Sequence, residues 1–217
     1  DILEGEDAGL DSVAVVRTPK QARATVDSGQ IAMLVAMEGA HGIDKRGVQG
    51  LRDLHARGLS MLGLTWSFDN KYAGSSSDGG GGVTALGWEL VVEANRLGVI
   101  LDVSHASDTA TMQVCGWSHA PVIASHSNTD AVRPHARNLD DAAIRCIARS
   151  GGVIGVNFHG DFVGGKRDVG AVADHADVLK RVGGAGVVAL GSDFDGLIKP
   201  VTGLATTSQL GALWDEL

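Results

Sequence analysis

The chain has few aromatic residues, few cysteines and no long apolar run, and each shortage excludes a class of protein. Phe, Trp and Tyr together make up 4% of the 217 residues, and the two cysteines are Cys115 and Cys146. Two cysteines cannot build a disulfide-stapled miniprotein, and we expect both to be small buried side chains. The longest apolar run, Ile31–Met37, is far shorter than the roughly 18 residues that a membrane-spanning helix needs.

Basic residues are also scarce relative to acidic ones. The chain has 18 Lys and Arg against 26 Asp and Glu, a net charge of −8. Because polyanion binding needs basic stripes, we expect no nucleic-acid partner. Glycine is abundant, with 31 residues, about twice the usual 7%. A chain of this length can bury a full core, and this composition suggests small-residue packing of helices on a parallel sheet.

Short, continuous apolar runs recur along the chain, as in strands that are covered on both faces. The runs are Ile31–Met37, Leu59–Thr65, Val99–Val103, Val122–Ala124, Val153–Phe158 and Val187–Gly191. Segments with helical periodicity lie between them, including 86–97, 139–147 and 172–183. Asn138 is the N-cap that we predict for the second of these helices. Strands alternating with helices predict a parallel α/β fold.

The spacing of the runs is compatible with two architectures. The five steps from Ile31 to Val187 average about 31 residues, as in a (β/α)8 barrel of about 250 residues. A doubly wound sheet fits this spacing nearly as well. The runs, however, end in polar residues: Glu38, Thr65, Asp102, Ser125, Asn157 and Asp193. Only a barrel brings so many strand ends to one mouth, so we predict a truncated (β/α)8 TIM-type barrel with about six of the eight βα units.

Four residues near these ends have metal-binding chemistry. Glu38, His105, His126 and Asp193 combine imidazole and carboxylate, which suits zinc or a similar divalent ion. Asp102 could be a metal ligand too, but it could equally orient a loop by hydrogen bonding. We read His55 and His175 as helix residues that do not bind metal, and His41 and His159 as candidates to support the ligands.

Two further segments could contribute to the mouth. In Arg133-Pro134-His135-Ala136-Arg137 one arginine can reach inward, and its planar guanidinium suits a substrate carboxylate. The glycine-rich tract Gly74–Gly82 has no phosphate-loop spacing and predicts a flexible loop over the mouth or a disordered segment. The sequence has no Gly-x-Ser-x-Gly nucleophile elbow and no His-Glu-x-x-His helix, either of which would indicate a different kind of catalytic site.

Several motifs together resemble one family. They are Met37-Glu38-Gly39-Ala40-His41, Leu101-Asp102-Val103-Ser104-His105, Ser125-His126-Ser127-Asn128, Arg137-Asn138, the segment 152–158 and Gly191-Ser192-Asp193-Phe194-Asp195-Gly196. In this order and spacing the chain is similar to the membrane (renal-type) dipeptidases, peptidase family M19, from about Gly29 to Gly196. The resemblance implies an amidohydrolase-like barrel that binds two zinc ions.

The resemblance also implies roles for individual residues. Glu38 would bridge both metals, and His105 and His126 would bind the second zinc. Asp193 would contact the bridging water and the substrate amine as general acid and base, and Arg137 would hold the substrate carboxylate. Trp66 occupies a substrate-binding position where many members have histidine. Because indole has one N–H donor and no basic lone pair, substrate preference is in doubt.

The family's first zinc is also held by a His-x-Asp pair upstream of the bridging glutamate, and nothing before Glu38 has that form. We therefore expect residues 1–217 to be a single incomplete metallo-dipeptidase barrel domain, a fragment of a longer protein with two upstream units missing. A barrel that lacks two strands exposes the unpaired edges of its sheet. We therefore expect aggregation or pairing with another chain, for example as a homo-oligomer.

The function that follows is zinc-dependent hydrolysis of dipeptides by a metal-activated bridging water, with a small dipeptide as the partner. Two alternatives stay open. One is a related amidohydrolase that acts on N-acyl amino acids or lactams. The other is a non-catalytic fragment with an incomplete metal site, which would bind fewer than two zinc ions and hydrolyse dipeptides poorly.

Overall fold

The structure is a computed structural model that describes residues 12–43 and 46–217. Its strands are β1 (Val13–Val15), β2 (Ile31–Met33), β3 (Val35–Met37), β4 (Leu59–Gly63), β5 (Ile100–Asp102), β6 (Val122–Ile123), β7 (Ile154–Val156) and β8 (Val188–Leu190). Its α-helices are α1 (Pro19–Asp27), α2 (Gly47–Ala56), α3 (Ala85–Leu97), α4 (Asp108–Trp117), α5 (Asp141–Arg149), α6 (Gly160–Val163), α7 (Val169–Gly183) and α8 (Gly211–Trp214). Short 3-10 helices are η1 (Ala40–Gly42), η3 (Ala185–Val187) and η4 (Thr207–Gln209).

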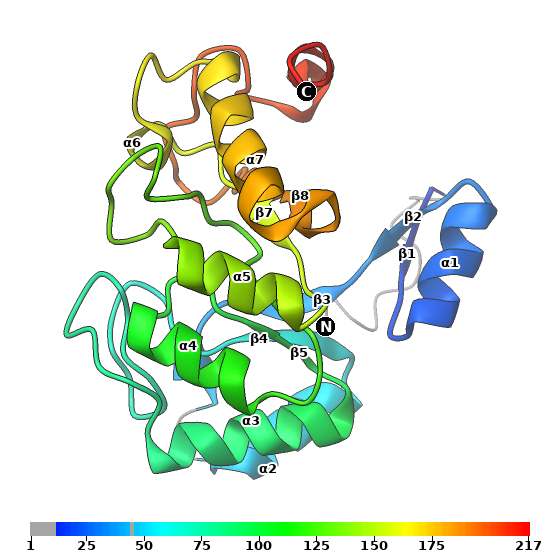
Figure 1. The fold of residues 1–217 in the computed structure, drawn as a ribbon. Helices are drawn as coiled ribbons and strands as arrows, with labels where there is room; N and C mark the ends of the chain where they lie inside the picture. The colour runs from blue at the N-terminus through cyan, green and yellow to red at the C-terminus, as the bar shows by residue number, and fades with distance from the viewer. Residues whose placement is uncertain (1–11, 44–45) are drawn as a thin grey trace.

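The main body is an arc of parallel strands in chain order. Strands β3, β4, β5 and β6 form one parallel sheet in that sequence, and β7 pairs in parallel with β8. A parallel bridge between Ala124 and Ile154 connects the end of β6 to β7. Helices α3, α4, α5 and α7 follow one another along the outside of this arc (Figure 1).

This topology confirms the predicted α/β class and the six predicted βα units. A doubly wound sheet reverses its strand order at a switch point. The neighbours here are consecutive instead, as in a (β/α)8 barrel. The carboxyl ends of β3 to β8 therefore face the same mouth, which is where the sequence has its polar residues.

Side-chain caps define where the main helices begin. Thr84 caps α3 and Asp168 caps α7 by accepting backbone N–H groups of the first turn. The predicted cap of α5 was wrong: Asp140 accepts from the Ala143 N–H at 2.7 Å. The Asn138 amide instead donates to the carbonyl oxygens of Arg133 and Phe162, so it ties two loops together.

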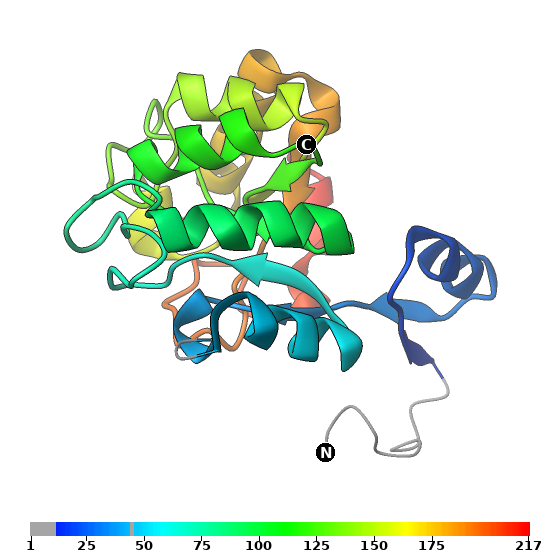
Figure 2. The ribbon, with the colours of Figure 1, turned by 90° about the horizontal axis from the view of Figure 1, so that it is seen from below.

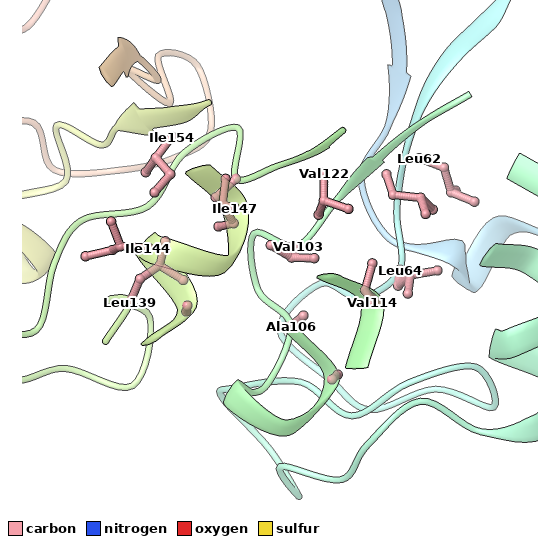
Figure 3. Packing of buried hydrophobic residues seen from close by; sticks show 14 of the residues in the cluster. Leu62, Leu64, Val103, Ala106, Val114, Val122, Leu139, Ile144, Ile147 and Ile154 are labelled. Atoms are coloured by element: carbon pink, nitrogen blue, oxygen red, sulfur yellow. The ribbon is translucent and has the colours of Figure 1, made fainter. Parts of the chain in front are cut away.

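The core lies between the strands and the outer helices. Figure 3 shows part of it, with Ile144 and Ile147 of α5 near Ile154 of β7, and all three are fully buried. Burying a side chain of this size contributes about 1.5–3 kcal/mol. This packing fixes α5 and β7 in place, and so supports the loops that follow β6 and β7.

A smaller unit, the arm, precedes the body and consists of β1, α1 and β2. It stands apart from the body in both views (Figures 1 and 2). The predicted strand Ile31–Met37 divides at Leu34: its first part pairs with β1 and its second part with β4. Strand β1 and helix α1 were not predicted from the sequence, because the apolar run of β1 is very short and α1 has no buried residue.

Within the residues that the structure describes, no helix is long and apolar enough to cross a bilayer.

Candidate metal and substrate site

Three of the predicted residues meet at the carboxyl ends of β3, β5 and β6. The Glu38 carboxylate oxygen Oε1 lies 2.9 Å from Nε2 of His105 and 3.3 Å from Nε2 of His126. The two Nε2 atoms are 3.0 Å apart. The strands that precede these residues belong to one parallel sheet, so the ends of β3, β5 and β6 open on the same side.

The donor set fits a divalent cation. Ligand atoms about 2.0–2.1 Å from a tetrahedral zinc lie roughly 3.3 Å from one another, close to the separations observed here. Among the described residues, Glu38, His105 and His126 form the only group of three or more His, Cys, Asp or Glu that could hold a metal ion.

Protonation states at this cluster also suit metal binding. Hydrogen bonds from His105 and His126 hold the pKa of the Glu38 carboxyl far below its usual range. Burial lowers the pKa of His105, and this outweighs the opposing effect of Glu38. A carboxylate and a neutral imidazole are the forms that bind metal, so the directions of these two pKa shifts favour the metal-binding forms of Glu38 and His105 at neutral pH.

His126 is oriented by a chain of hydrogen bonds. The Ser125 hydroxyl donates to Asp102 Oδ2 at 2.5 Å and lies 2.8 Å from His126 Nδ1. When Ser125 donates to Asp102, its oxygen can accept from His126 Nδ1–H, and in that tautomer the His126 Nε2 lone pair is free to bind a metal. Asp102 is buried and also accepts from the backbone N–H groups of Ser104 and Ser125.

The loop-orienting alternative for Asp102 is therefore confirmed, and Ser125 was missed as a supporting residue. The signal for Ser125 was weak, since only its position directly before His126 marks it. Its contact with Asp102 crosses from β6 to β5, and such a contact follows from the strand register rather than from the local sequence.

The backbone at His105 is held in an unusual conformation. Its φ is 69°, in the left-handed region that costs energy for residues other than glycine. The glycine-rich tract holds it there, because the Ser76 N–H donates to the His105 carbonyl at 2.9 Å. Ser75 and Ser107 add further hydrogen bonds across the tract. The predicted flexible loop is thus fastened to the site rather than left free over the mouth.

Arg137 lies in the interior with its positive charge only partly compensated. The side chain is 5% exposed, its Nη2 is 3.4 Å from the His126 carbonyl, and its guanidinium lies 5.5 Å from the Phe162 ring centre. Its Nε has no hydrogen-bond partner. Burial lowers the pKa of Arg137 to about 10, while Asp102, Asp193 and Glu38 act in the opposite direction. The group stays charged at neutral pH and is available to an anion.

Asp193 follows β8 and is not part of the three-residue cluster. Its φ of 62° is also left-handed. Asn157, which is fully buried after β7, donates its side-chain amide to Asp193 Oδ2 at 3.1 Å. Asn157 is itself fixed by Asn128, whose Oδ1 accepts from the Asn157 N–H. The sequence marks Asn157 only as a strand end, because its contact with Asp193 is a result of folding.

Trp66 lies at the rim of the same region. The side chain is 46% exposed, its ring centre is 6.4 Å from that of His105, and it packs edge-on against Phe68 at 6.1 Å. An exposed indole beside the cluster offers apolar surface to a ligand.

The remaining histidines have other contacts. His55 contacts the Leu59 carbonyl, and buried His175 contacts the Thr129 N–H and the Val163 carbonyl, as expected for structural residues. His159 caps α6 and stacks on Phe162, whereas His41 is exposed in η1.

Comparison with known proteins agrees with this geometry. Residues 6–217 match the sequence profile of membrane dipeptidases, peptidase family M19. A protein encoded in the pqqA 5′ region of Klebsiella pneumoniae is 37% identical over 183 residues, which are 78% of this chain and 67% of that protein. Dipeptidase verJ of Clonostachys rogersoniana is 34% identical over 212 residues, 95% of this chain and 54% of that protein.

A solved structure has the same fold. The metallo peptidase of Rhodobacter sphaeroides, crystallised with a phosphinate mimic of the dipeptide L-Ala-D-Ala, superposes with a TM-score of 0.85 at 34% identity. The match covers 95% of this chain and 62% of that one. The chain thus spans between about half and two thirds of the length of these relatives. By sequence and by structure, it belongs to the membrane dipeptidase family, peptidase family M19.

Proposed function

We propose that the site binds zinc and hydrolyses dipeptides. The observation that carries this proposal is the convergence of Glu38, His105 and His126 at separations that match zinc ligands. Family membership supports it, because relatives are named dipeptidases and the similar solved structure is a metallo peptidase. The chain draws its site residues from β3 to the segment after β8, so we also propose that residues 1–217 act as one incomplete barrel domain.

Glu38, His105 and His126 would hold the ion. When bound there, zinc supplies a Lewis acid that lowers the pKa of a coordinated water toward 7. Ser125 and Asp102 keep the His126 ring in the required orientation and tautomer.

Substrate binding would use the charged groups beyond the cluster. Arg137 is buried and lacks a partner at Nε, so a substrate carboxylate would complete its hydrogen bonds. Asp193 would bind the free amine of the dipeptide. Trp66 would pack against a substrate side chain, since its indole is exposed beside His105.

Asp193 would also move the proton. Asn157 holds Oδ2, so the carboxylate has a fixed direction. Asp193 would accept a proton from the attacking water and give it to the leaving amine as the peptide bond breaks.

The experiment begins with metal analysis. We expect one zinc ion per chain, because the described residues contain one three-donor group, and we expect Glu38→Gln to lose it. Binding of a phosphinate mimic of Ala-Ala by the zinc-loaded chain then tests substrate recognition without requiring turnover. Wild-type protein that binds no zinc at all would contradict the proposal.

A matched substrate panel separates the alternatives. We expect the zinc-loaded chain to prefer L-Ala-L-Ala over its C-terminal amide, which Arg137 cannot hold as an ion pair, and over N-acetylalanine, which has no amine for Asp193. Equal or faster cleavage of N-acetylalanine would favour the N-acyl amino acid alternative. Zinc and phosphinate binding without any cleavage would favour a non-catalytic fragment.

A further inference from the structure

The two cysteines are brought together by packing of neighbouring helices. Cys115 lies on α4 and Cys146 on α5, and these helices lie side by side in both views (Figures 1 and 2). Both thiols are free, and both side chains line the same cavity. Two residues separated by 31 positions in the sequence therefore form one dithiol.

The dithiol is reachable from solvent. Cys115 is half-buried and Cys146 is 8% exposed. Both line a cavity of about 430 Å3 together with Ser118, His119, Arg149 and Ser150. Arg149 adds positive charge to this polar cavity, so the opening favours a small anionic reagent.

A metal site does not explain the pair. A soft ion would need further ligands beside the two thiols. In the part of the chain that the structure describes, the only group of three or more candidate ligands is at Glu38, His105 and His126. The chemistry left for two adjacent thiols is oxidation.

We propose that Cys115 and Cys146 form an intramolecular disulfide by exchange with a small anionic disulfide such as oxidised glutathione. The Cys115 thiolate attacks one glutathione sulfur, forms a mixed disulfide and releases one glutathione thiolate. The Cys146 thiolate then attacks the Cys115 sulfur and releases the second. Two protein thiols lose two electrons and two protons in total, and one glutathione disulfide is reduced to two glutathione thiols.

Burial and the neighbouring thiol raise the pKa of Cys115. Exchange therefore starts slowly at neutral pH, because little thiolate is present. Once the mixed disulfide forms, we expect the second step to be fast, since Cys146 lines the same cavity as Cys115.

The disulfide would cross-link the part of the chain that carries much of the site. The segment between the cysteines contains β6, Ser125, His126 and Arg137. Closing a loop of this length restricts the unfolded chain, so we expect oxidation to raise Tm by about 5 °C or more.

The test uses the whole chain, oxidised glutathione and intact-mass spectrometry. We expect wild-type protein to lose the mass of two hydrogens and both titratable thiols. It should still run as a monomer on a non-reducing gel, and dithiothreitol should reverse the increase in Tm. Cys146→Ser is the matched control, and we expect it to stop at a Cys115 adduct carrying one glutathione.

Three outcomes would overturn the proposal: wild-type protein that stays as the glutathione adduct, wild-type protein that keeps both thiols although its unfolded form oxidises, and a disulfide between two chains. None of these outcomes depends on zinc or on dipeptide cleavage, so the test of the disulfide is independent of the proposed function.

Discussion

The arm and the body of this chain follow the same β-α-β pattern but bury very different amounts of side chain. In the arm, α1 has no buried residue, and Ile31 of β2 is 63% exposed. In the body, α5 alone buries Ala143, Ile144, Cys146 and Ile147. Regular backbone structure therefore forms in both, but only the body has a core that can hold the geometry of the candidate site.

Polar contacts of Arg17 link the two regions. Arg17 of the arm reaches the carbonyl oxygens of Ala56 and Arg57 at the end of α2, at 3.4 and 3.5 Å. Long hydrogen bonds of this kind contribute little. The comparison predicts that substitutions in the body change stability and ligand binding, whereas substitutions in the arm change little.

The largest expected effect is loss of core packing in the body. Ile144→Ala should lower the free energy of unfolding by about 2–5 kcal/mol, because it leaves a cavity in a fully buried site. Val26→Ala in α1, where the side chain is 61% exposed, should cost less than about 0.5 kcal/mol. Urea unfolding measures both, and equal costs would abolish the distinction between the two regions.

Metal binding should stabilise the body next most strongly. Zinc at one hundred times its Kd should add about 2.7 kcal/mol to the free energy of unfolding, because it binds only the folded site. Glu38→Gln should remove this gain, since it takes away the carboxylate that both imidazoles contact. Calorimetry with and without zinc measures the effect, and an unchanged gain in the variant would mean that zinc binds elsewhere.

A smaller effect should come from the support of His126. Ser125→Ala should weaken zinc binding about 10–100-fold, because the His126 ring loses the contact at Nδ1 that fixes its orientation. Ser127→Ala is the matched control, as its hydroxyl contacts that of Ser104 at 3.4 Å. Titration with a competing chelator measures both, and similar losses in the two variants would show a general packing effect.

The smallest effect concerns pH and the outer helices of the body. Arg96 and Arg52 lower the pKa of the Glu93 carboxyl to about 2, linking α3 to α2. A lowered pKa gives stability that is present above pH 4.5 and is lost as the pH falls toward 2. Glu93→Gln should reduce this loss of stability at low pH by about 1 kcal/mol. The effect is small because both arginines are exposed to solvent. Urea unfolding from pH 7 to pH 3 measures it. If the free energy of unfolding falls with pH as steeply in the variant as in the wild type, other groups cause the acid sensitivity.

The prediction of the fold succeeded where local signals were strong. The six apolar runs became the six strands of the body, because a run of β-branched and small residues buried on both faces has few alternatives. The arm was missed for the opposite reason. Its helix has no apolar stripe to mark it, and its second strand merges with β3 in one apolar run.

The sequence by itself determined the alternation of strands and helices, and the polar residues at the strand ends, through periodicity and composition. It also identified Glu38, His105 and His126 as candidates. Only the tertiary structure decided that these three side chains meet within 3.3 Å, that Ser125 joins Asp102 to His126, and that Asn157 directs Asp193. The physical reason is that such contacts depend on the register and curvature of neighbouring strands, which arise from packing of the whole core.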